Sequence, residues 1–207
     1  MLWLLHATLL GAWAADPPAA PAAEVPAAAA AAWRELSAER LTARFEQVQH
    51  RSVLAKPLHA TGSLAYARPD RVRWTVDAPV RSVFVLDGAR ASSALPDLGH
   101  RETLDLSQQP EAARLVQGLL VWLGGDLARV ARDYDVAWQD GPPAVATLTP
   151  RDPTLKKLLA RIELTVGGAP RQVERVVLHE PSGDYVEITL SDVVVDPVLP
   201  PGTFDPP

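Results

Sequence analysis

Polar and apolar residues alternate with a period of two along much of the chain after Thr61. In two neighbouring runs every second residue falls on a single face: Leu64, Tyr66 and Arg68 in the first run, and Val72, Trp74 and Val76 in the second. Such alternation is typical of half-buried strands. Pro69-Asp70 separates the two runs and favours a tight turn, because Pro fixes its backbone angle and Asp tolerates the corner. The pattern therefore predicts an antiparallel hairpin.

Further strands are predicted by the same alternation at 81–86, 144–149, 161–166, 172–179 and 185–190. Turn residues separate the strands, at Asp87-Gly88, Pro150 to Pro153, Gly167-Gly168 and Pro181 to Asp184. Because no helix crosses between neighbouring strands, we expect an antiparallel meander and not a parallel sheet.

The middle of the chain has a different period. Residues 109–123 place apolar side chains three and four positions apart, which is typical of an amphipathic helix. Gly124-Gly125 would end this helix, and Asp126 is a suitable cap for a second, short helix through Arg132. Residues 94–108, which precede the helical region, are predicted to form a loop.

Residues 33–50 fit two structures. Trp33, Leu36, Leu41, Phe45 and Val48 nearly follow a helical spacing, whereas the stretch from Leu41 to Glu46 also alternates like a strand. The high helix propensity of residues 32–41 favours one long helix on sequence alone.

The N-terminal residues indicate export. Residues 1–15 contain a short apolar run followed by Ala12-Trp13-Ala14, the spacing of a signal-peptidase site, so we expect a signal peptide there. Residues 16–32 are almost entirely Pro and Ala and are predicted to be a flexible tether. With no cysteine in the chain, a lipid-anchored N-terminus and a disulfide framework are not expected. The predicted mature protein is exported, soluble and unanchored, with one domain at 33–207.

Charge and motifs argue against nucleic-acid binding and against a catalytic site. The formal net charge is −5, whereas nucleic-acid binding requires a basic face. The five histidines, at 6, 50, 59, 100 and 179, show no metal-binding spacing, although a site could still assemble in space. Asp184 and Glu187 are three residues apart on one predicted strand, so their side chains would lie on opposite faces of the sheet and make a poor acid–base pair. We expect no cofactor and no metal.

An antiparallel sheet of about ten strands curls strongly, and the predicted cover over its apolar face is only one or two helices and the N-terminal segment. Such a geometry can leave an apolar cavity, or side chains can fill it as an ordinary core. Composition alone favours the filled core.

An ordered set of residues resembles the LolA family of periplasmic carriers, which deliver lipoproteins to the outer membrane. The front half carries Phe45-x-Gln47, Gly62, Arg68-Pro69, Trp74, Pro79 and Asp87-Gly88; the back half carries Leu148-Thr149-Pro150, Gly183-Asp184 and Phe204. The resemblance covers about residues 34–205. Leu123 to Leu127 looks closer to a LolA-like branch than to the principal carriers.

The resemblance implies an α+β fold, a curled and incomplete antiparallel barrel of about ten to eleven strands, with helices as a lid over an apolar cavity. By analogy, the first helix should end near Ser37, and Leu41 to Gln49 should be the first strand with Phe45 pointing inward. Arg68 matches the arginine that holds the family's lid closed through backbone carbonyls. A solvated arginine, or one packed on Trp74, is the plainer interpretation of Arg68 taken alone, but the matching residues around it favour the latch.

The expected function is that of a monomeric, non-catalytic carrier for an acylated lipoprotein or another lipid. It would work in the periplasm between an inner-membrane exporter and an outer-membrane acceptor, both of them implied by the resemblance. The alternatives are an envelope sensor that shares the fold and, less favoured, a secreted enzyme. The spacing that places residues on one face and the resemblance together suggest which residues line the cavity. Packing in an ordinary core would explain the same residues: Phe45, Leu64, Tyr66, Trp74, Leu115 and Leu119.

Overall fold

The computed structural model describes residues 25–36, 38–110, 112–113, 116, 122–123, 127–169 and 171–207. Within these ranges the chain forms eleven strands, which are β1 (Arg40–His50), β2 (Leu58–Ala67), β3 (Arg71–Ala78), β4 (Ser82–Asp87), β5 (Arg90–Leu95), β6 (His100–Asp105), β7 (Tyr134–Gln139), β8 (Ala144–Pro150), β9 (Arg161–Gly167), β10 (Gln172–His179) and β11 (Tyr185–Val195). The described helical elements are α1 (Ala27–Leu36), η2 (Pro96–Leu98), η3 (Leu106–Gln108), α3 (Leu127–Asp133) and α4 (Pro153–Lys156).

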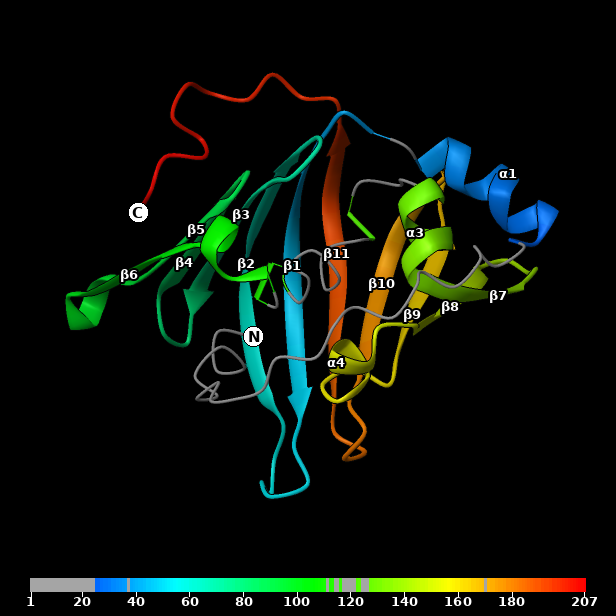
Figure 1. Ribbon diagram of the computed structural model, residues 1–207, viewed down its shortest axis with the longest axis horizontal. Coiled ribbons are helices and arrows are strands. Elements are labelled where there is room, and N and C mark those ends of the chain that lie inside the picture. The colour runs from blue at the N-terminus through cyan, green and yellow to red at the C-terminus, as the bar shows by residue number, and fades with distance from the viewer. Residues whose placement is uncertain are drawn as a thin grey trace.

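The described strands form one antiparallel sheet in the order β6-β5-β4-β3-β2-β1-β11-β10-β9-β8-β7. Every neighbouring pair is also adjacent in the chain, except β1 and β11, which join the front and back halves of the sequence. The sheet does not close, because β6 and β7 lie at its two ends. The expected α+β architecture, a curled and incomplete barrel, is confirmed (Figure 1).

The cover lies over the half of the sheet that contains the later strands (Figure 1). Helix α1 contacts α3 and β10, α3 also contacts β7, and α4 contacts β8. Asp152 begins α4, where its carboxylate accepts hydrogen bonds from the backbone N–H groups of Thr154 and Leu155. The turn predicted at Pro150 to Pro153 is shorter in the structure, because β8 ends at Pro150 and α4 begins at Pro153.

The region around residue 41 is a strand and not a long helix. β1 pairs with β2 on one side and with β11 on the other, so its backbone groups are bonded in two ladders. These ladders outweigh a weak helix propensity. The helix ends at Leu36 and Phe45 is buried, as the resemblance implied.

Two further expectations need correction. The predicted loop at 94–108 contains the end of β5, the edge strand β6 and two short 3₁₀ helices. The predicted tether at 16–32 does not extend to Ala32, because α1 begins at Ala27 and buries Ala29 and Ala32. Alanine has the highest helix propensity, and these two methyl groups are fully buried, so the run forms a helix. Residues 1–24, which include the expected signal peptide, lie outside the described residues.

The two predicted helices are found in part. Pro110, Ala112, Ala113 and Val116 are helical, in agreement with the helix expected at 109–123, whose other residues are mostly outside the described ranges. The short helix expected through Arg132 is α3, which ends one residue later; its expected cap, Asp126, is not among the described residues. The predicted turns at Gly88, Gly168 and Gly183 are confirmed, each with a positive φ.

Candidate functional site

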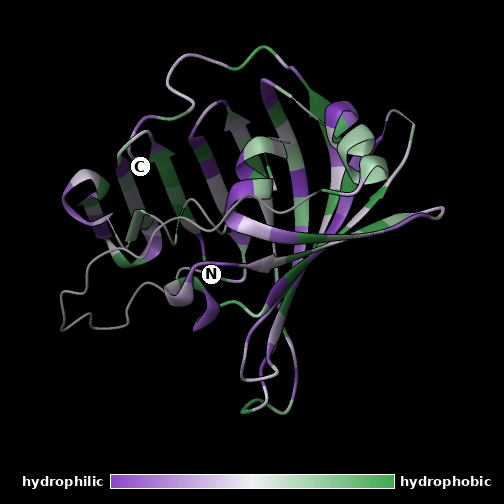
Figure 2. Ribbon diagram, turned by 45° about the vertical axis from the view of Figure 1, so that its right-hand side comes forward, coloured by the Kyte–Doolittle hydropathy of each residue, from purple (hydrophilic) through white to green (hydrophobic). Residues whose placement is uncertain are grey.

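The inner face of the sheet, defined by Phe45 of β1, Leu64 of β2 and Trp74 of β3, is apolar. These three side chains are 3%, 2% and 5% exposed, and Tyr66 beside them is 5% exposed. All four belong to one hydrophobic cluster that continues across β8 to β11. Figure 2 shows the alternation of polar and apolar residues along the strands that produces this face. Four of the six residues expected to line a cavity are thus brought together.

Phe45 and Trp74 form the centre of this face in the front half of the sheet. Their rings stack with centroids 4.2 Å apart and an interplanar angle of 29°. Gly62 lies beside Phe45 in the β1–β2 register, and a methyl group there would collide with the Thr75 carbonyl and come within 2.6 Å of Phe45 Cζ. The glycine therefore lets the aromatic ring lie flat over strand β2.

The elements that cover the inner face contribute to the same cluster. Trp33 of α1 is 1% exposed and meets Trp138 of β7 edge to face, with ring centroids 6.3 Å apart. Val130 of α3 is fully buried, and Val116 and Trp122 also join the cluster. Leu115 and Leu119, the other two expected lining residues, lie outside the described residues. The described part of the lid thus packs on the apolar face.

Arg68 lies just after β2 and reaches the connection between α1 and β1. Its Nε donates a hydrogen bond of 3.1 Å to the carbonyl oxygen of Ala38, and its backbone N–H donates to the carbonyl of Glu39 at 2.8 Å. From the other side, Asp196 Oδ1 accepts hydrogen bonds from the backbone N–H groups of Glu39 and Arg40. The segment that links the covering helix to the sheet is therefore held at both sides, once by an arginine and once by a carboxylate.

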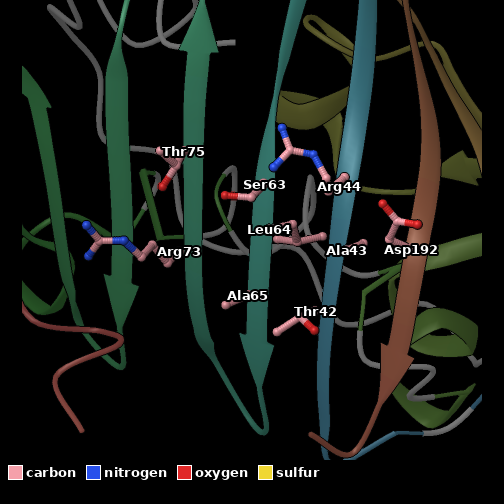
Figure 3. A pocket seen from close by; sticks show the side chains of 9 residues that line it. All are labelled: Thr42, Ala43, Arg44, Ser63, Leu64, Ala65, Arg73, Thr75 and Asp192. Carbon is pink, nitrogen blue, oxygen red and sulfur yellow. The ribbon is translucent and has the colours of Figure 1, made fainter. Parts of the chain in front are cut away.

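The outer face, defined by Arg44 of β1, Ser63 of β2 and Arg73 of β3, is polar and carries a shallow depression of about 330 Å³. Figure 3 shows its lining, which is Thr42, Ala43, Arg44, Ser63, Leu64, Ala65, Arg73, Thr75 and Asp192. Six of these nine residues are polar or charged, so the depression is not the apolar cavity that the resemblance implies.

The chain's C-terminal segment, residues 196–207, contacts the same outer face through residues 203–205. Arg73 Nη1 lies 3.4 Å from the Thr203 carbonyl oxygen and 3.3 Å from that of Asp205, and donates to both. The guanidinium of Arg71 lies over the Phe204 ring, 5.1 Å from its centroid. Arginine–carbonyl contacts thus occur on both faces of the sheet, from different strand positions.

The outer face of β9 to β11 is covered by charged pairs. Arg175 donates two hydrogen bonds of 2.6 Å to the Glu187 carboxylate, which holds the pKa of Glu187 below its usual range. Burial tends to raise the pKa of Glu163, but a hydrogen bond from Arg161 and the nearby His179 lower it on balance. Within the described ranges, no group of three or more His, Cys, Asp or Glu side chains could hold a metal ion.

The histidines that could have formed a metal site lie in two separate places. His50 stacks on Tyr185 with centroids 4.2 Å apart, and His179 lies 5.8 Å from the same ring. His59 instead faces Glu46 across β1 and β2, with 3.8 Å between His59 Nδ1 and Glu46 Oε1.

In the described part of the chain, no helix is long and apolar enough to cross a bilayer.

These features define a class of protein, an open antiparallel sheet whose inner apolar face is covered by helices. Residues 37–207 match the family described as "Outer membrane lipoprotein carrier protein LolA", and the chain belongs to this family.

Sequence relatives carry the name "Outer-membrane lipoprotein carrier protein". One, from Pseudomonas syringae pv. syringae, is 30% identical over 55% of this chain and 53% of its own length. Another, from Pseudomonas fluorescens, is 24% identical over 80% of this chain and 76% of its own length. The chain spans about half the length of the first relatives that it matches.

Among solved structures, the complex of MucA and MucB from Pseudomonas aeruginosa matches the fold with a TM-score of 0.51. Its sequence identity is 14%, over 87% of this chain and 62% of the matched chain. At this identity the match concerns the fold alone.

Proposed function

We propose that this protein is a non-catalytic periplasmic carrier, which holds the acyl chains of a lipoprotein or another lipid between the inner face of the sheet and its helical cover. The observation that carries the proposal is the single apolar cluster shared by the inner face and by α1 and α3. Membership of the LolA family supports it.

The energetics of acyl chains set the mechanism. Burial of a palmitoyl chain is worth roughly 12 kcal/mol at about 0.8 kcal/mol per methylene. A carrier must therefore keep nearly the whole chain out of water, or the chain returns to a bilayer. The inner face is already covered in this structure, since Phe45, Trp74 and Trp33 are each at most 5% exposed. Loading therefore requires the cover to move away from the sheet.

Arg68 is proposed as the latch that resists this movement. A guanidinium offers several donors in a fixed plane, and the chain beyond a helix C-terminus exposes carbonyls that need partners. The bond from Arg68 Nε to the Ala38 carbonyl ties the end of α1 to the end of β2. Opening the cover would break this bond, so the latch favours the empty state and makes release to an acceptor easier.

Transfer from the inner toward the outer membrane would then depend on partners. In this proposal an inner-membrane exporter loads the carrier, an outer-membrane acceptor binds the cargo more tightly, and the carrier works as a monomer. The arrangement requires no cofactor.

The test is native mass spectrometry of the chain purified from its own envelope without detergent, as wild type, Arg68→Leu and Arg73→Leu. A hydrogen bond from a charged group contributes about 1.5–3 kcal/mol, so Arg68→Leu should retain an acylated adduct at least about tenfold more strongly. Arg73→Leu is the matched control, because Arg73 also donates to backbone carbonyls but on the outer face. It should behave like wild type. If all three proteins remain bare after incubation with envelope lipids and lipoproteins, the carrier proposal fails.

A second candidate is an envelope sensor. The fold match to MucB, solved in complex with MucA, favours it. The same mass spectra distinguish the two, since a sensor of that kind would be recovered with a protein partner and a carrier with an acylated adduct.

A further inference from the structure

A buried polar side chain lies among the apolar residues of the inner face. Gln47 of β1 is 3% exposed, and its Oε1 is buried without a hydrogen-bond partner. Buried polar side chains are nearly always hydrogen-bonded, and an unpaired one costs free energy that an apolar residue of the same size would not. Gln47 therefore lowers the stability of the empty protein.

The position of Gln47 is central to the sheet. It follows Phe45 on the inner side of β1, and its register partners are Ala60 on β2 and Ile188 on β11. Ile188 is 1% exposed and belongs to the apolar cluster. The backbone of β1 is bonded to both neighbouring strands, so the sheet does not require the Gln47 amide.

Another buried polar residue shows what a structural role looks like. Ser92 of β5 is 4% exposed, and its hydroxyl is hydrogen-bonded to Thr103 Oγ1 on β6 at 3.3 Å. That pair links two neighbouring strands within the fold. Gln47 has no such bond to its Oε1, which leaves an unpaired acceptor on the face where the cargo is proposed to lie.

We propose that Gln47 Oε1 accepts a hydrogen bond from the amide N–H of an N-linked acyl group, so that the carrier prefers amide-linked to ester-linked acyl chains. This inference rests on the proposed carrier function. The chemistry follows from the atom, because an oxygen acceptor requires a donor. An acyl amide has an N–H directly beside its carbonyl, whereas an acyl ester has none.

Two probes isolate this difference, N-palmitoylglycine and its ester counterpart, palmitoyloxyacetic acid. They share the palmitoyl chain and the terminal carboxylate and differ only in N–H against O. Affinity is measured by competition against a fluorescent fatty acid, with wild type, Gln47→Met and Gln49→Met. Gln49 is the matched control, because it lies on the same side of β1, two residues further on, and is only half-buried.

Wild type and Gln49→Met should bind the amide about three- to tenfold more tightly than the ester, the factor expected of one net hydrogen bond. Gln47→Met should bind both probes equally and have a higher melting temperature when empty, since it replaces an unpaired amide by an apolar chain of similar length.

Other results overturn the inference. Equal binding of both probes by wild type would mean that the acyl amide donates no hydrogen bond to Gln47 Oε1, which then binds water or remains unpaired. The inference would fail, and the carrier proposal would not be affected. A preference that survives in Gln47→Met, or a lower melting temperature of that variant, would assign Gln47 a structural role. If wild type binds neither probe nor the fluorescent fatty acid, the carrier proposal and the inference fall together.

Discussion

The inner and outer faces of β1, β2 and β3 are formed by alternate residues of the same strands, yet they are held by different forces. Phe45 and Trp74 on the inner face are stacked and almost fully buried. Arg44 and Arg73 on the outer face are bound to Asp77 and to C-terminal carbonyls, in contact with water. Burial is worth several kcal/mol per large side chain, whereas exposed charged pairs contribute about 1 kcal/mol or less. The two faces should therefore respond very unequally to substitution.

The largest effect is expected at Trp74. Trp74→Ala removes the partner of Phe45 and leaves a cavity in the cluster, which costs about 3–5 kcal/mol of unfolding free energy. Thr75 follows Trp74 in β3 and lies on the outer face, so Thr75→Ala should cost less than about 1 kcal/mol of unfolding free energy. Urea unfolding of both variants measures the difference. Similar losses at the two positions would mean that the inner face is not the main source of stability.

A smaller loss of unfolding free energy is expected from Gly62→Ala, which adds a methyl group to β2. The new Cβ would meet the backbone carbonyl of Thr75 and the Phe45 ring, neither of which can move easily. Overpacking of this kind costs about 1–3 kcal/mol. Gly167→Ala is the control, because its new Cβ would meet only the flexible end of the Glu174 side chain, at 2.7 Å. That variant should lose less than about 1 kcal/mol, and an equal loss would show that strand glycines matter for another reason.

The sequence predicts the inner face well because period-two alternation is a local signal. Residues 64–67 and 72–76 could be assigned without knowledge of their partners, and the structure confirms them as parts of β2 and β3, whereas Arg68 lies just beyond the end of β2. β1 could not be assigned in this way, since its helix propensity is overridden by pairing with two strands, β2 and β11, the second of them far away in the chain. The residues of β6 show no alternation of polar and apolar side chains, because β6 is an edge strand with mostly exposed polar side chains.

The candidate site was predictable only in part for the same reason. Parity placed Phe45, Leu64 and Trp74 on one face, and burial confirms that they share it. The atom that Arg68 contacts lies thirty residues earlier in the chain, so no local pattern could identify it. Gln47 stood in the sequence as part of Phe45-x-Gln47, but whether a buried amide finds a partner depends on the packed structure.

The smallest effect, and the one that tests the outer face, concerns the Arg175–Glu187 pair. The hydrogen bonds from Arg175 lower the pKa of Glu187 in the folded protein. Because this pKa lies below the unfolded-state value of about 4.3, the pair's stabilisation is present above that pH and is lost as the pH falls through the folded-state pKa. The loss should be about 1 kcal/mol or less, since the Arg175 side chain is 43% exposed.

Melting temperatures between pH 7 and pH 3 measure this loss in wild type, Glu187→Gln and Arg175→Met. Either substitution should reduce the acid-dependent fall in stability, and by a similar amount, because each removes the same pair. Trp74→Ala should leave the shape of the pH profile unchanged while lowering the whole curve. If Glu187→Gln and Arg175→Met keep the full acid dependence, the pair contributes nothing measurable, and the outer face is stabilised by strand pairing and the C-terminal segment alone.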